Sequence, residues 1–121
     1  MNKEECVNRI YNELMTERNR PFTIVCCFHS RRDMQNFIQS ILDRFIYIRK
    51  TKINLGIVSD CFSSTVGNNN RIYFMHDNCK CLDGINPDLF YYQEGFYYSN
   101  LVDILKYKSS AVKNSEIYSF K

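Results

Sequence analysis

The residues of this chain that could do chemistry fall into two groups. The first stands at the end of an apolar run, Leu89 to Tyr92, where the polar pair Gln93-Glu94 is followed by a glycine. Open α/β sheets use a short buried strand with an acid at its C-terminal end to place a carboxylate beside a bound nucleotide. Gln93 is therefore a candidate binding residue, and Glu94 is the candidate catalytic acid.

The second group contains both histidines, each with cysteines nearby in the sequence. Zinc takes thiolate and imidazole ligands in a tetrahedron. The candidate ligands are Cys27, His29, His76, Cys79 and Cys81. The alternative is a set of ordinary thiols and loop histidines, because Cys-x-Cys is less typical of structural zinc than Cys-x₂-Cys. The sequence leaves a zinc site open and calls for no other cofactor.

Two further catalytic patterns fit poorly. A Cys79–His76 nucleophile would need a third group to orient the base, and none is marked in the sequence. Asp88 followed by Glu94 has the spacing of some metal-dependent nucleases, but Phe96 stands where those enzymes place a lysine.

Basic side chains could meet an anion. Ser30 begins a loose capping box, and Arg31 and Arg32 then stand at a helix N-terminus, where backbone N–H groups also attract phosphates. The alternative is a solvated helix flank. The formal charge of +3 permits a nucleic-acid partner without requiring one.

Composition indicates one intracellular domain spanning residues 1–121. The chain is 45% hydrophobic, which is enough for one core. No apolar run approaches the roughly 20 residues that span a bilayer, and the N-terminus lacks a secretory signal, so no membrane partner is expected. The six cysteines should then be reduced thiols, with Cys26 and Cys27 packed in the core.

Hydrophobic periodicity predicts an α/β fold with a single three-layer domain, in which helices flank a mainly parallel sheet of four or five strands. We expect strands at residues 22–28, 53–58, 71–75 and 89–92, with an edge strand at 116–120. Helices are predicted over residues 3–18, from Ser30 to Phe45, and around 101–105, and residues 60–70 are predicted to be a loop.

Three segments resemble the RecA-like ATPase core of viral DNA-packaging terminase large subunits, a group of P-loop NTPases. They are Thr23 to Ile38, Asn70 to Phe74 with the Leu82-Asp83-Gly84 turn, and DLFYYQEGF at residues 88–96. The last is similar to the herpesvirus-type pattern of apolar residues, Asp-Glu, a small residue and an aromatic. The resemblance implies that Ser30, Arg31, Arg32 and Gly84 are binding positions and that Glu94 orients water.

The departures from that family imply lost catalysis. These 121 residues contain no Gly-x-x-x-x-Gly-Lys-Ser/Thr loop to wrap a phosphate. Gln93 replaces the aspartate that holds Mg²⁺, and a neutral amide is a weak ligand for a hard dication. Glu94 would then be vestigial. Either the chain is one piece of a split enzyme, or it kept the fold and lost hydrolysis.

The resulting hypothesis is a non-catalytic or incomplete terminase-like domain, of viral origin, located in the cytoplasm or nucleus of the host cell. It would act by binding a protein partner, or alternatively DNA. The alternative from another class is a small zinc-stabilised regulatory or adaptor protein. In a third interpretation, the strand simply ends at a surface Gln93-Glu94 pair that never had a catalytic role.

Overall fold

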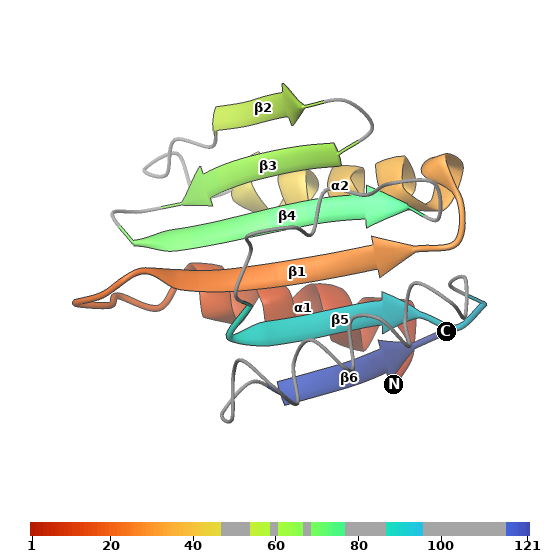
Figure 1. Ribbon diagram of the computed structural model, residues 1–121, viewed down its shortest axis with the longest axis horizontal. Helices are drawn as coiled ribbons and strands as arrows, with labels where there is room; N and C mark the ends of the chain where they lie inside the picture. Colours follow the sequence, from red (N-terminus) through yellow and green to blue (C-terminus); the bar gives the residue numbers. More distant parts are fainter. Residues whose placement is uncertain (47–53, 59–60, 67–68, 77–86, 96–115) are drawn as a thin grey trace.

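The described strands form one six-stranded sheet (Figure 1). The computed structural model describes residues 1–46, 54–58, 61–66, 69–76, 87–95 and 116–121. Its elements are α1 (Lys3–Leu14), β1 (Phe22–Phe28), α2 (Arg31–Ile46), β2 (Asn54–Val58), β3 (Cys61–Val66), β4 (Asn70–His76), β5 (Leu89–Gln93) and β6 (Glu116–Phe120).

The strand order is β2-β3-β4-β1-β5-β6. Strands β4, β1, β5 and β6 run parallel, while β3 pairs antiparallel with both β2 and β4. The predicted α/β class and mainly parallel sheet are confirmed, with six strands in place of the four or five expected. Parallel neighbours need crossover connections, which is why β1 and β4 are adjacent in space but far apart in sequence.

Strand β1 lies between two parallel neighbours, and its sequence FTIVCCF has the continuous apolar character of a strand buried on both faces. Its residues alternate between the two faces. Ile24, Cys26 and Phe28 face the helices, whereas Val25 and Cys27 point to the opposite face and are also fully buried. Burial on both faces is typical of a central strand in a parallel sheet. Both described helices cover the same face (Figure 1), so the described residues do not show the third layer of the predicted arrangement.

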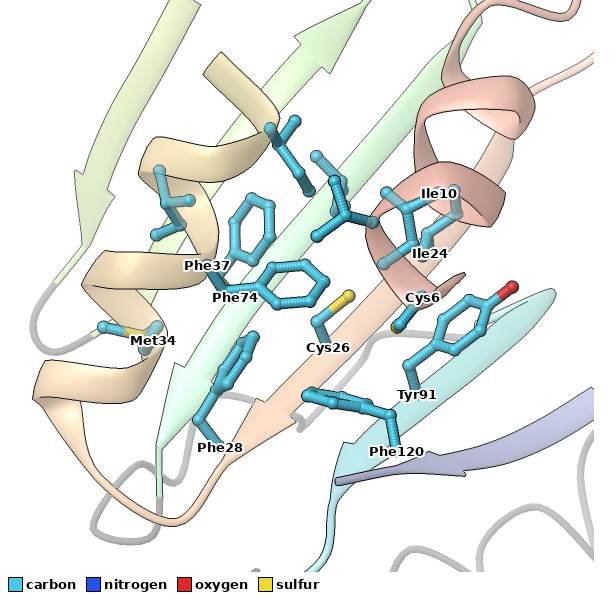
Figure 2. Packing of buried hydrophobic residues seen from close by; sticks show 14 of the residues in the cluster. Cys6, Ile10, Ile24, Cys26, Phe28, Met34, Phe37, Phe74, Tyr91 and Phe120 are labelled. Atoms are coloured by element: carbon cyan, nitrogen blue, oxygen red, sulfur yellow. The ribbon is translucent and has the colours of Figure 1, made fainter. Parts of the chain in front are cut away.

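Helices α1 and α2 both cover one face of the sheet (Figure 1). Three phenylalanines from different elements meet beneath α2 (Figure 2). The ring of Phe28 lies 5.0 Å from that of Phe37 and 5.6 Å from that of Phe120, and the Phe37 and Phe120 centroids are 5.4 Å apart. These contacts join β1, α2 and the edge strand β6 into one core. No helix in the described part of the chain is long and apolar enough to cross a membrane.

The buried thiols pack rather than react, as expected for Cys26 and Cys27. Burial raises the pKa of the Cys6 thiol to about 12, and it raises the pKa of Cys26 well above its ordinary value. Both thiols therefore stay protonated at neutral pH, and the thiolate is the form that reacts or binds metal. Cys6, Cys26 and Cys27 are free cysteines, as predicted.

Two predictions from the sequence are wrong, one about a loop and one about the end of a helix. Residues 61–66, predicted to be part of a loop, form β3, because backbone pairing with β2 and β4 on either side decides the structure of this small and polar stretch. Helix α1 ends at Leu14, earlier than predicted, because Asn70 binds the carbonyl oxygens at the helix end. The predicted helix around residues 101–105 lies outside the described residues.

Asn70, at the start of β4, joins the end of α1 to the sheet. It is only 3% exposed, and its amide nitrogen donates to the carbonyl oxygens of Leu14 (3.1 Å) and Thr16 (2.8 Å). Its side-chain oxygen accepts from the guanidinium of Arg18 at 2.7 Å. That guanidinium lies 3.5 Å over the ring of Phe22 and pairs with Glu13. The hydrogen bonds of the buried Asn70 amide thus hold the turn between α1 and β1 in place.

Replacing this amide should destabilise the fold. Asn70→Ala removes the amide that bonds two carbonyl oxygens and the Arg18 guanidinium, which keeps its pair with Glu13. We therefore expect a loss of about 2–3 kcal/mol in the free energy of unfolding. Urea denaturation followed by circular dichroism measures it. The control Asn19→Ala, at an exposed position of the same turn, should change stability by less than about 0.5 kcal/mol. An Asn70→Ala variant as stable as this control would contradict the assigned role.

Candidate functional site

The carboxyl ends of β1 and β5 meet at one edge of the sheet because the two strands are parallel neighbours. Pairing runs from Ile24 opposite Leu89 to Cys27 opposite Tyr92, so His29 follows β1 close to Gln93. This adjacency confirms the predicted position of the 89–92 strand beside the 22–28 strand. It brings together four residues that we name the carboxyl-edge cluster: His29, Asp33, Gln93 and Gly95.

Hydrogen bonds connect the carboxyl-edge cluster. The backbone N–H of His29 donates to Oε1 of Gln93 at 3.2 Å, and Nε2 of His29 lies 2.9 Å from Oδ2 of Asp33. The same Asp33 oxygen accepts a long bond of 3.4 Å from Nε2 of Gln93. The Gln93 amide therefore links the end of β5 to both β1 and the first turn of α2.

Helix α2 begins as the sequence predicts. The hydroxyl oxygen of Ser30 accepts from the backbone N–H of Asp33 at 3.2 Å, which satisfies one of the free donors of the first turn. Asp33 in that turn is also favoured by the helix dipole. Arg31 and Arg32 are exposed beside the cluster. The sequence missed Asp33 as a site residue, although its spacing from His29, four residues apart across a helix start, signals the contact.

Glu94 lies at the carboxyl edge of the sheet, as predicted, and its side chain is exposed. Its backbone N–H donates to the carbonyl oxygen of Phe120 at 2.7 Å and so continues the pairing of β5 with β6. Within the described ranges, its carboxylate makes no hydrogen bond or ion pair. Gly84, the remaining predicted binding residue, lies outside the described residues.

Asp88 has a structural position at the other end of β5. Its carboxylate accepts from the backbone N–H of Thr23, and its own N–H donates to the Thr23 carbonyl oxygen, both at 2.8 Å. Asp88 and Glu94 are six residues apart along an extended chain, roughly 20 Å at about 3.3 Å per residue. Two carboxylates at that separation cannot hold one ion, so the weak nuclease pattern has no support.

The predicted zinc ligands are only partly described, since Cys79 and Cys81 lie outside the described residues. The register pairs Phe28 with His76 and Cys27 with Met75, so strand alternation places Cys27 and His76 on opposite faces of the sheet. His29 is engaged with Asp33. His76 is 8% exposed, and in the described part of the chain its Nε2 has no hydrogen-bond partner. The described residues contain no group of three potential ligands placed to hold a metal ion.

The turn that closes the carboxyl-edge cluster requires glycine. Gly95 has φ of +92°, in the region that L side chains rarely adopt, and a Cβ there would contact the His29 ring at 3.4 Å. Gly95→Ala should lower the free energy of unfolding by about 1–2 kcal/mol through backbone strain. Thermal denaturation measures this, with the exposed neighbour change Glu94→Ala as a nearly neutral control. An unchanged melting temperature for Gly95→Ala would refute this geometry.

Comparison with known proteins identifies the fold. No protein-family model and no curated protein sequence matches the chain. Among solved structures, the large terminase ATPase domain of Thermus phage P74-26 is similar, with a TM-score of 0.70 at 9% identity, over 98% of this chain and 54% of that one. The large terminase of another thermophilic bacteriophage, in complex with ADP, gives a TM-score of 0.59 at 11% identity, over 91% of this chain and 28% of that one.

A second crystal form of the latter terminase gives a TM-score of 0.61 at 10% identity, again over 91% of this chain and 28% of that one. The chain thus spans about half the length of the Thermus phage structure and under a third of the other terminase. At such low identity the likeness is one of fold. The chain has a terminase-like ATPase fold, and the resemblance inferred from the sequence is confirmed at that level.

Proposed function

We propose that this chain is a non-catalytic terminase-like domain that acts by binding a protein partner. The observation that carries the proposal is the hydrogen bonding of Gln93. At the end of β5, where the resemblance implies a metal-binding aspartate, the chain has an amide that binds the His29 backbone and approaches Asp33. A neutral side chain in these contacts joins three elements of the fold and offers little to a divalent cation.

The neighbouring charges support the same conclusion. The carboxylate of Asp33 accepts the long bond from Gln93, and it also pairs with His29. Glu94 retains a carboxylate, but an exposed acid can orient water for attack only where other groups hold the phosphate, and the described residues at this edge include no such set. The 121 residues contain no phosphate-binding loop sequence. Catalysis by phosphoryl transfer depends on such positioning groups, so we expect this chain by itself not to hydrolyse ATP.

A protein partner is favoured over DNA by the modest charge. Sixteen basic and thirteen acidic residues leave little electrostatic attraction for a nucleic-acid backbone. We also propose a viral origin, from the herpesvirus-type pattern at residues 88–96, and a location inside the host cell. The zinc-stabilised adaptor gains no supporting observation from the described residues.

The proposal predicts no ATP turnover. The purified chain should release phosphate from ATP at the same rate with Mg²⁺ and with EDTA, in a coupled phosphate-release assay. Gln93→Asp should not create activity. It should instead lower the free energy of unfolding by about 1–2 kcal/mol, because it removes an amide and places a carboxylate near Asp33.

The matched control is Gln35→Asp, which makes the same change at an exposed position of α2 and should be close to neutral. Magnesium-dependent turnover by the unmodified chain would reject the proposal. Turnover that arises only in Gln93→Asp would show that the amide alone had switched off a complete site.

A further inference from the structure

The outer edge of β6, the last strand in the order, is paired with no other strand among the described residues, and we call it the open edge. Backbone groups of successive residues in a strand point to alternate sides. Phe120 points toward β5, because its carbonyl oxygen accepts from the Glu94 N–H, whereas the N–H of Lys121 points away and donates to Met1 at 3.1 Å. The backbone groups of Ile117 and Ser119 therefore face outward from β6. No described residue pairs with them, since β6 is the end of the strand order (Figure 1).

A small pocket lies beside this edge, on the face of the sheet that carries the helices. It encloses about 200 Å³ between α1 and strands β5 and β6. Its lining residues are Arg9, Asn12, Glu13, Leu89, Tyr91 and Tyr118. Pockets for drug-sized molecules and cofactors are about 300–1,000 Å³, so this volume suits one side chain of a partner better than a whole cofactor.

The floor of the pocket provides a hydrogen-bond donor. Tyr91 is 2% exposed and its ring stacks on Tyr118 with centroids 5.4 Å apart. Its hydroxyl points away from the other labelled core residues (Figure 2), and Tyr91 is one of the residues that line the pocket. Burial raises the pKa of the Tyr91 phenol above its ordinary value, so the O–H remains available to donate.

The wall of the pocket provides a positive charge. The guanidinium carbon of Arg9 lies 5.2 Å over the Tyr118 ring. Glu13, the acid that also lines the pocket, is paired with Arg18. Within the part of the chain that the structure describes, Arg9 thus has no carboxylate partner. A cation and a phenolic donor at one small pocket match the chemistry of a carboxylate.

The open edge and the pocket fit one kind of occupant. A strand that adds to a sheet edge gains main-chain hydrogen bonds, and its alternate side chains enter pockets on one face. Neighbouring strands lie about 4.8 Å apart, so a side chain of an added strand would stand next to Tyr118 and within reach of Arg9. A glutamate at that position would bring its carboxylate between Arg9 and Tyr91.

We propose that an extended, acidic segment of another protein adds as a strand to the outer edge of β6. Its backbone pairs with Ile117 and Ser119, and a glutamate of the segment binds at Arg9 and Tyr91. This inference rests on the proposed partner-binding function, and it assigns the surface and the chemical class of the partner.

The test is a titration of the ¹⁵N-labelled chain with two synthetic peptides, Thr-Val-Thr-Glu-Thr-Val-Thr and its Glu→Gln counterpart, followed by amide chemical shifts. We expect shifts at Ile117 and Ser119, and about fivefold tighter binding of the glutamate peptide, which corresponds to about 1 kcal/mol. Arg9→Gln should abolish that preference. The control Arg20→Gln changes the same charge at an exposed position outside the pocket and should retain it.

The main-chain contribution is tested separately. Ser119→Pro removes an outward N–H at an edge strand, where proline is tolerated, and should weaken both peptides. Should that variant fail to fold, peptides N-methylated at alternate residues replace it. The peptides whose N-methyl groups lie on the edge that faces β6 should bind the unmodified chain at least tenfold more weakly than the peptides without N-methyl groups.

Three results would overturn the inference. They are no shift at Ile117 and Ser119 with peptide at about 1 mM, equal binding of both peptides, and the same shifts produced by the chain dimerising through β6 without peptide. The outcome is separable from that of the proposed function. ATP turnover would reject the non-catalytic assignment and leave the peptide result unchanged, whereas failed peptide binding leaves the absence of turnover unaffected.

Discussion

Strand β1 is hydrogen-bonded to β4 on one side and to β5 on the other, and both of its faces are buried. The position of β1 fixes the arrangement of β5, α2 and β6 around it. Because the pairings are parallel, the ends of β1 and β5 open onto one edge of the sheet, and His29 reaches Gln93. Because Phe28 contacts both Phe37 and Phe120, the same strand connects α2 and the distant edge strand β6 to one core.

The two ends of the sheet have different chemistry. At the amino end, Asp88 and Asn70 use buried or partly buried polar groups to fix the strands and the turn after α1. At the carboxyl end, where α/β sheets commonly bind ligands, Gln93 joins the strand to α2, and Glu94 faces solvent. The end of β5, where such sheets commonly bind ligands, is thus the site of the Gln93 contacts with His29 and Asp33. The fold is terminase-like, while Gln93 at this edge is a neutral side chain in contact with His29 and Asp33.

The sequence predicted the parts whose signal is local. The apolar run of β1, the capped start of α2 at Ser30, and strand β5 were all predictable from periodicity and turn chemistry. The predicted loop at 60–70 failed because the pairing of β3 with two distant strands is not visible in its small polar residues. The early end of α1 depends on Asn70, 56 residues after Leu14. Asp33 was missed as a site residue for a similar reason, because its bond to Gln93 joins residues 60 positions apart in the sequence.

The proposed function requires that the carboxyl edge of this sheet does not hold a metal–nucleotide complex. Paramagnetic broadening by Mn²⁺–ATP measures it most directly, since Mn²⁺ broadens amide resonances of nearby residues in the ¹⁵N-labelled chain. The account predicts that the amides of His29, Gln93 and Glu94 keep the linewidths that they show with a Mn²⁺ chelate that has no nucleotide. Selective broadening of these three amides by Mn²⁺–ATP, reversed by excess Mg²⁺–ATP, would contradict it.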